Sequence, residues 1–407
     1  MRRTFAPPSQ SNSPVTDELA DATPAVGPPA PVARSRRSRR LRRATIAAGV
    51  VALLLVVPGI SYAKALAYPG SASVQMRSVE WVRDHGGSPL IDRVENWYYT
   101  TNSPQGSVPD PAALPAAKPA GRASARTAAM APPTRLPVLT GHPRKGVAGE
   151  GVWVPGRLDA KGTPALYTSF VRPDRAHPSV VAGVSWIRAA DTRTHFMAGT
   201  REPSGGGWPG DARVTPSEVP TLAATFNSGW KLSGARGGLY LAGRTAKPLR
   251  DGQASLVIND SGVATVGQWG RDVRMTPHVA AVRQNLALIV DHGRPAPGLT
   301  ANQKQRWGNT KNQFQYTWRS AVGVDAGGNL VYVGGVNLTL KAITTAMVDA
   351  GVVRGMELDI HSAMVSFSSW TPHGATVTPT KLLPNMQRAA DRYLAPDQRD
   401  FFYVTVR

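Results

Sequence analysis

Acidic and basic side chains alternate with apolar ones in the stretch Met356-Glu357-Leu358-Asp359-Ile360-His361. If this stretch is a strand, successive side chains point to opposite faces, so Glu357, Asp359 and His361 share one face. Two carboxylates roughly 7 Å apart, with an imidazole beyond them, suit acid–base chemistry on a small polar substrate. The same trio could ligate a divalent metal. A half-exposed strand with a polar outer face gives the same alternation, so all three interpretations stay open.

A second stretch, Thr225 to Lys231, combines an apolar strand with an Asn227-Ser228-Gly229 turn. It places the Asn227 amide and the Lys231 ammonium at a loop tip, although Asn and Gly are also what ordinary turns use. Arg319 and Arg283 each stand inside an otherwise apolar run. A guanidinium there needs either a carboxylate partner or an anionic ligand. Together these residue types suit a glycan or phosphate site.

Three motifs, in this order, resemble the phosphodiester glycosidase family, whose domain occurs in the mammalian uncovering enzyme and in bacterial proteins linked to exopolysaccharides. The matching segments are Asn227-Ser228-Gly229-Trp230, then 319–323 followed by Gly328-Asn329-Leu330, and lastly Glu357-Leu358-Asp359. Family members usually carry an Asn-x-Gly-aromatic turn, an Arg-x-x-x-Gly strand and an Asp-Gly-Gly-Gly-Ser segment. The first two match. The third keeps the aspartate, but Ile360-His361-Ser362-Ala363 replaces the glycines and serine, and a glycine run would let backbone amides approach a ligand closely.

The resemblance implies a hydrolase that splits a sugar from a phosphodiester at the anomeric carbon, without a cofactor. Asp359 and Glu357 would activate water or face the cationic sugar ring. Arg319, with Arg283, would hold the phosphate, and Asn227 would bind sugar hydroxyls. Lys231 and His361 complete the predicted substrate-binding set.

Two other functions compete with this one. The first is a non-catalytic envelope protein that binds an anionic, phosphorylated glycopolymer, which the missing glycine run favours. The second is a metal-dependent phosphodiesterase that uses the trio of Glu357, Asp359 and His361. It is less favoured, because a tight metal site usually needs a further ligand and the other histidines show no supporting spacing.

The N-terminal part of the chain predicts membrane attachment. Residues 1–43 read as a disordered tail that ends in an arginine cluster, and residues 44–63 carry no charge. About 20 apolar residues can span a bilayer, and flanking arginines stay on the cytoplasmic side. A cleaved signal peptide ending at Ala65-Leu66-Ala67 and a buried core helix are the alternatives. The prediction is a single-pass protein of the cell membrane with its C-terminal domain outside.

Composition and patterning predict the rest of the organisation. Residues 64–102 read as short helices that could pack on the main domain or lie at the membrane surface, 103–146 as a Pro/Ala-rich linker, and 147–407 as the working domain. In that domain, short apolar runs between turn residues predict a strand-rich α+β fold with a mixed sheet and a few helices. Leu166–Val171 and Phe401–Val406 are two of these runs. One predicted helix begins near residue 340, with Asn337 or Thr339 as its cap, and stops at Gly351, and a second helix covers 384–394.

Charge and cysteine content exclude several function classes. The net charge of +21 is spread over the chain, and the working domain has no basic run and no zinc-finger or RNA-recognition signature. We therefore predict no nucleic-acid partner and an attraction to anionic wall polymer or lipid headgroups instead. The chain contains no cysteine, which excludes cysteine nucleophiles, cysteine-ligated zinc and iron–sulfur clusters.

Overall fold

The computed structural model describes residues 36–106, 108–115, 132, 135–136, 138, 147–308, 314–374 and 376–407. The chain divides into two compact units, Met1–Ile60 and Ser61–Arg407. Residues 1–35 of the predicted tail lie outside the described residues. So do most residues of the predicted linker from 116 to 146.

The first unit contains most of helix α1 (Arg36–Leu66), which includes the predicted membrane segment 44–63. Side chains 50–55 of that segment lie outside the described set. Within the part of the chain that the structure describes, no helix has both the length and the apolar character needed to cross a membrane.

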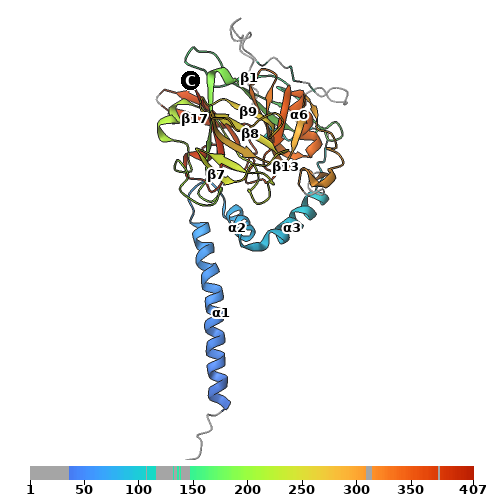
Figure 1. Ribbon diagram of the computed structural model, residues 1–407. Coiled ribbons are helices and arrows are strands. Elements are labelled where there is room, and N and C mark those ends of the chain that lie inside the picture. Colours follow the sequence, from blue (N-terminus) through green and yellow to red (C-terminus); the bar gives the residue numbers. More distant parts are fainter. Residues whose placement is uncertain are drawn as a thin grey trace, which may run out of the picture. The chain divides into compact units, whose positions relative to one another are not determined.

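The second unit is built on three antiparallel sheets (Figure 1). The first contains, in spatial order, β1 (Val154–Pro155), β2 (Leu166–Val171), β3 (Ala182–Ile187), β14 (Leu330–Leu338), β13 (Thr317–Asp325), β15 (Val352–Glu357), β11 (Leu288–Asp291) and β12 (Arg294–Pro295). The second contains β7 (Arg244–Lys247), β6 (Leu239–Leu241), β10 (Val279–Gln284), β8 (Ala254–Asn259) and β9 (Ala264–Gln268). The third contains β17 (Thr376–Lys381), β16 (Phe367–His373), β5 (Leu222–Asn227), β18 (Phe401–Val406) and β4 (Thr192–Met197).

This architecture confirms the predicted strand-rich α+β domain with few helices. Every pairing between the described strands is antiparallel, so the mixed sheet of the prediction is not seen among them. The apolar runs at Leu166–Val171 and Phe401–Val406 are strands β2 and β18 with the predicted bounds. The largest core cluster joins the sheets through side chains such as Leu166, Phe226 and Leu256.

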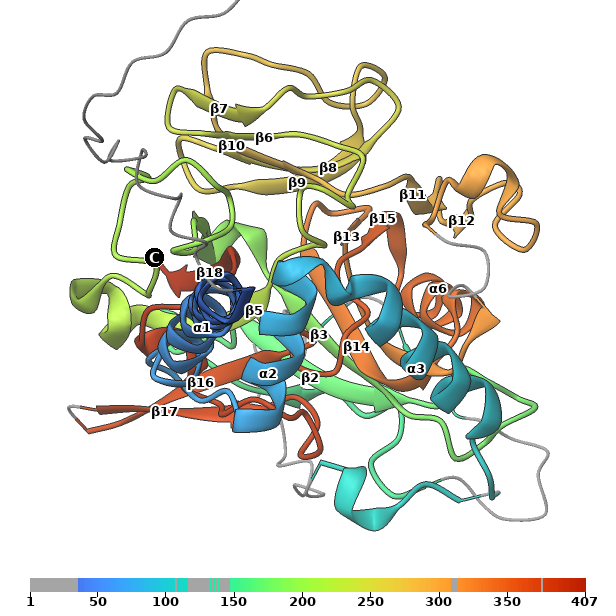
Figure 2. The same cartoon turned by 90° about the horizontal axis from the view of Figure 1, so that it is seen from below.

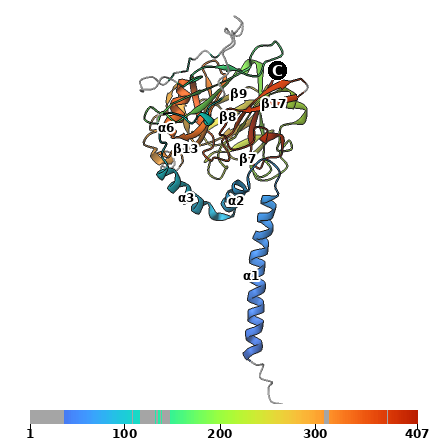
Figure 3. The ribbon, with the colours of Figure 1, turned by 180° about the vertical axis from the view of Figure 1, so that it is seen from behind.

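Helix α6 (Leu340–Asp349) packs against β13 and β14 and lies beside β13 in both Figure 1 and Figure 3. Its start and stop are the predicted ones, because the Thr339 hydroxyl caps the Ala342 amide and Gly351 follows with φ of 81°. The helix predicted over 384–394 is wrong. That segment forms turns and one short 3-10 turn, η6 (Arg392–Leu394), because its side chains are tied to other segments, as when Arg392 donates to the Ala363 and Met364 carbonyls.

Residues 64–102 form α2 (Val74–Val82), a kinked turn η1 (Arg83–Gly87) and α3 (Ser88–Thr101). Gly86 takes a positive φ of 86° at the kink, where the sequence breaks the helical pattern. Figure 2 shows these helices in front of the sheets when the second unit is seen from below. Asn96 of α3 accepts a hydrogen bond of 2.7 Å from Gln315, which attaches the helix to the segment before β13. Four apolar side chains of α3 remain exposed, namely Leu90, Val94, Trp97 and Tyr98.

Candidate functional site

Residues from the three family-like motifs meet at one point of the fold. Asn227 ends β5, Ser320 lies in β13, and Asp359 follows β15 by two residues. The Asn227 amide donates to the Ser320 hydroxyl at 2.9 Å. The Ser320 backbone N–H and hydroxyl both donate to the Asp359 carbonyl, at 2.9 and 3.2 Å. The order of the strands in the sheets thus brings together segments that lie far apart in the sequence.

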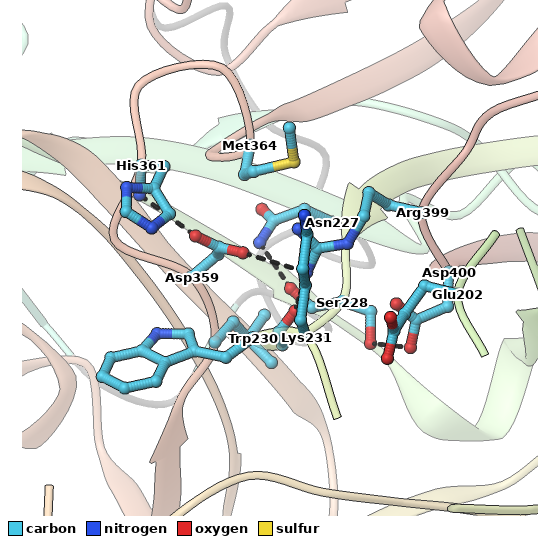
Figure 4. Close-up of polar contacts among 12 residues, drawn as sticks. Glu202, Asn227, Ser228, Trp230, Lys231, Asp359, His361, Met364, Arg399 and Asp400 are labelled. Carbon is cyan, nitrogen blue, oxygen red and sulfur yellow. Dashed lines mark hydrogen bonds and ion pairs between the residues drawn. The ribbon is translucent and has the colours of Figure 1, made fainter. Parts of the chain in front are cut away.

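Asp359 is the central carboxylate of this point and is only 1% exposed. Its Oδ1 accepts hydrogen bonds from the backbone amides of Ile360 at 2.8 Å and His361 at 3.1 Å. Its Oδ2 lies 3.4 Å from the Arg399 guanidinium (Figure 4). Two fixed amides and one cation therefore hold the carboxylate in a single orientation. The backbone amides of Ile360 and His361 therefore bind this aspartate.

His361 stands next to Asp359, and about a third of its side chain, 32%, is exposed (Figure 4). Its Nδ1 is 3.7 Å from the Glu95 carboxylate of α3. Burial lowers the pKa of His361, and the nearby Arg83 guanidinium acts in the same direction. The imidazole is therefore mostly neutral at pH 7, and it can accept a proton or donate a hydrogen bond.

Asn227 is buried, and its amide is fully used inside the protein. Besides Ser320, its nitrogen donates to the Ser228 carbonyl at 2.8 Å, and its oxygen accepts from the Tyr332 hydroxyl at 3.0 Å and the Ser366 amide at 3.1 Å. These contacts lock the turn that carries Trp230 and Lys231. In this structure Asn227 positions the turn and has no free group to offer a sugar hydroxyl.

Lys231 has 31% of its side chain exposed and meets the N-terminal helical segment at Glu80 and Asp84. We call this place the mouth of the site. The Lys231 ammonium pairs with Asp84 at 2.5 Å and with Glu80 at 3.3 Å, both on the N-terminal helical segment. Burial by itself would raise the pKa of Glu80, but Lys231, Arg399 and Arg83 outweigh it and lower that pKa to about 2. The helical segment thus presents ionised carboxylates to the cations at the mouth.

Arg319 and Glu357 form a separate, fully buried ion pair. The two side chains are 0% exposed and lie 2.5 Å apart, and Arg319 also donates to the Leu338 carbonyl at 2.7 Å. Burial raises the pKa of Glu357, and Arg319 opposes that rise. β15 ends at Glu357, and Asp359 lies beyond it. The two carboxylates therefore contact different arginines: Glu357 contacts Arg319, and Asp359 contacts Arg399.

Arg283 is the second arginine that the sequence predicts at the site. It lies 2.6 Å from Asp400, and both side chains are at most 1% exposed. The Ser228 hydroxyl donates to the same carboxylate at 3.0 Å. Of the two alternatives for arginines inside apolar strands, the carboxylate partner is therefore present for Arg319 and for Arg283.

Sequence reasoning missed the arginines of the C-terminal segment. Arg399 contacts Asp359 and donates to the Gly229 carbonyl at 2.9 Å, so it joins the third motif to the first. Arg392 holds Asp397 with two contacts of 2.7 and 3.1 Å. Arg388 reaches the same carboxylate at 3.4 Å. The only sequence signal was the abundance of arginine and aspartate between 388 and 400, which has no periodicity.

A cavity of about 390 Å³ opens between the N-terminal helices and the loop after Asp359. Its walls include apolar side chains of α2 and α3, the carboxylates of Glu80 and Glu95, and His361. Among the residues that the structure describes, no group of three or more His, Asp and Glu side chains is placed to hold a metal ion.

No protein-family model matches the sequence, and no curated protein matches it either. Among solved structures, the chain is similar to the catalytic domain of zebrafish N-acetylglucosamine-1-phosphodiester alpha-N-acetylglucosaminidase, auto-inhibited by its pro-peptide. The identity is 14% and the TM-score 0.41, over 62% of this chain and 86% of that one. A hypothetical protein from Synechocystis is similar at 13% identity and a TM-score of 0.36, over 60% of this chain and 63% of that one. Values this low assign no activity to the chain.

Proposed function

We propose that the chain is a membrane-anchored hydrolase of the cell envelope that cleaves the bond between a sugar's anomeric carbon and a phosphodiester. The observation that supports this most is the cluster around Asp359. The motif-bearing turn at Asn227, the β13 strand and the segment after β15 meet there, and Arg399 adds a cation beside the carboxylate. A buried, oriented carboxylate next to a cation and a neutral imidazole is suited to acid–base chemistry on an anionic sugar derivative.

In this reaction a water oxygen forms a bond to the anomeric carbon, and the bond from that carbon to the phosphate oxygen breaks. The electron pair leaves with the phosphate, which departs as a phosphomonoester. Because that group is a weak base, it needs less help from a general acid than an ordinary glycoside does. Asp359 accepts the proton of the water or faces the cationic ring, and Arg399 balances the negative charge. His361, beside the carboxylate, contacts the substrate at the open edge.

The two buried pairs support this site from within the sheets. The Arg319–Glu357 pair fixes the end of β15 from which Asp359 projects. The Arg283–Asp400 pair, with the Ser228 hydroxyl, fixes the turn that precedes Trp230. In the proposal, Glu357, Arg319, Arg283 and Asn227 are therefore positioning residues, while Asp359 reacts and Lys231 and His361 bind.

Membrane attachment and the substrate class are part of the proposal. The uncharged segment 44–63 after an arginine cluster would hold the domain at the outer surface of the cell membrane, where a phosphorylated glycan or wall polymer is within reach. A non-catalytic protein that binds such a polymer is the second candidate. The observation that favours it is the replacement of a glycine run by Ile360-His361-Ser362-Ala363 after Asp359.

A turnover assay tests the proposal. The full chain in detergent is given a sugar 1-phosphodiester, and release of the free sugar is measured. Asp359→Asn keeps the side-chain shape and removes the charge, so we expect at least about a 100-fold loss of activity with an unchanged thermal melt. The matched control is Asp260→Asn, whose side chain is 61% exposed and lies outside the site. Full activity of Asp359→Asn would rule out the assigned role.

A further inference from the structure

A second, smaller cavity of about 50 Å³ lies between residues 65–81 and the C-terminal segment. Five arginines contribute to its lining: Arg77, Arg201, Arg388, Arg392 and Arg399. The carboxylates in the lining are those of Glu80 and Asp397. Guanidinium groups outnumber carboxylates in this lining, and two of the arginines have a carboxylate partner just outside it: Asp84 lies 3.1 Å from Arg201, and Asp359 lies 3.4 Å from Arg399. The space is large enough for a group of several heavy atoms. A buried excess of positive charge costs free energy unless an anion compensates it.

The pairing of these arginines is uneven. Arg392 holds Asp397 with two contacts of 2.7 and 3.1 Å and is satisfied. Arg77 is satisfied too, since it donates to backbone carbonyls of the loop before α2, including those of Ala72 and Gly70 at 2.8 Å. These two residues build the walls of the cavity.

Arg388 is bound loosely, and Arg399 is bound only in part, since it donates to the Gly229 carbonyl at 2.9 Å and has another N–H unpaired. Arg388 is only 7% exposed, and its side-chain contacts are long, 3.4 Å to Asp397 and 3.3 Å to the Ser71 hydroxyl. Arg399 is 8% exposed, and its Nε has no hydrogen-bond partner among the described residues. The unpaired N–H of Arg399 is costly, and the long contacts of Arg388 are weak, so both side chains have capacity for a further anionic oxygen.

The electrostatics agree with the geometry at Arg388 and differ at Arg399. Burial by itself would lower the pKa of Arg399, but Asp359, Asp400 and Glu80 outweigh it and raise that pKa. Burial lowers the pKa of Arg388 to about 10, and the neighbouring Arg392 acts in the same direction. This shift means that the charge on Arg388 is under-compensated where it stands.

We propose that this cavity binds a phosphate group through Arg388, Arg399 and Arg201. Planar guanidinium groups match the oxygens of a phosphate with paired hydrogen bonds, which a single lysine cannot do. Arg201 has a side chain that is 44% exposed, so the cavity borders solvent on that side. Because Arg399 also contacts Asp359, a phosphate held there lies next to the proposed reaction centre. The assignment rests on the proposed function only in taking this phosphate to be that of the substrate or of the phosphomonoester product.

Binding of inorganic phosphate and of glucose 1-phosphate to the full chain tests the proposal, by calorimetry against chloride and glucose at equal ionic strength. We expect both phosphates to bind and the two controls not to bind. In Arg388→Gln the dissociation constant for phosphate should rise about ten-fold or more, the scale of one charge-assisted hydrogen bond. Arg213→Gln is the matched control and should bind as the parent does, because Arg213 is a partly exposed arginine outside the cavity.

Two further variants keep the test decisive. Arg201→Gln, at the exposed rim, should weaken phosphate binding without loss of stability. It provides the test if Arg388→Gln does not fold. Arg388→Lys keeps the charge and loses the paired geometry, so its affinity should fall between that of the parent and that of the glutamine variant. Equal heats for phosphate and chloride, or unchanged affinity in the variants of Arg388 and Arg201, would overturn the assignment. Phosphate binding without any turnover would reject the proposed hydrolase and leave this cavity assignment standing.

Discussion

Arginines occur in two contrasting settings in this protein. Inside the sheets, Arg319 and Arg283 each have one carboxylate at 2.5 and 2.6 Å, and all four side chains are at most 1% exposed. Around the small cavity, Arg388 and Arg399 have carboxylates no closer than 3.4 Å, and one buried N–H of Arg399 is unpaired among the described residues. Close one-to-one pairing fixes strands relative to one another. Loose pairing beside a cavity leaves donors for a ligand.

The comparison predicts that substitution of a buried glutamate, Glu357, lowers the free energy of unfolding far more than substitution of a partly exposed one, Glu95. Glu357→Ala removes the carboxylate that lies 2.5 Å from the buried Arg319 guanidinium, and the loss of this charge compensation should cost about 3–5 kcal/mol of the free energy of unfolding. Glu95→Ala removes a carboxylate of α3 that is 33% exposed and pairs with Arg83. That loss should be about 1 kcal/mol or less, because solvent screens the pair. Chemical denaturation of both variants gives the two values, and similar losses would erase the distinction between the two settings.

A smaller effect is expected at the mouth of the site, where Glu80 holds α2 against Lys231. The pKa of Glu80 is about 2 in the folded chain, against an ordinary value of 4.5. A carboxylate whose pKa is lowered on folding stabilises the folded chain at any pH above its ordinary pKa. This contribution is lost as the pH falls through the pKa of the folded state. Attachment of α2 should therefore weaken between pH 4.5 and 2.

Hydrogen exchange of the α2 amides (Val74–Val82), corrected for intrinsic rates, measures this attachment. Protection of α2 should fall on acidification in the parent chain. In Glu80→Gln it should be low throughout and nearly independent of pH over this range. If parent and variant follow the same curve, Glu80 does not hold the helix.

Much of the fold could be predicted from the sequence, because its signals are local. The apolar runs of β2 and β18 lie between turn residues, and Thr339 and Gly351 mark the ends of α6. The helix expected over 384–394 failed because long-range arginine contacts outweigh local propensity there.

The arrangement of the site could be predicted only in part. The motifs identified Asp359 and the Asn227 turn as neighbours in function, and the structure brings them together. The alternation of polar residues suggested that Glu357 and Asp359 act side by side. Instead the strand ends at Glu357, since Asp359 binds the two amides that follow it. The pairing of Arg283 with Asp400 spans 117 residues and has no local signature.

The most direct test of the central claim is to run the hydrolysis of a sugar 1-phosphodiester in water enriched in oxygen-18 and to locate the label by mass spectrometry. Attack of water at the anomeric carbon, as proposed for the Asp359 site, puts the heavy oxygen into the released sugar and none into the phosphomonoester. Label in the phosphate would show that the phosphorus–oxygen bond breaks and that the chain is a phosphodiesterase. Absence of turnover by the intact chain would contradict the hydrolase assignment altogether.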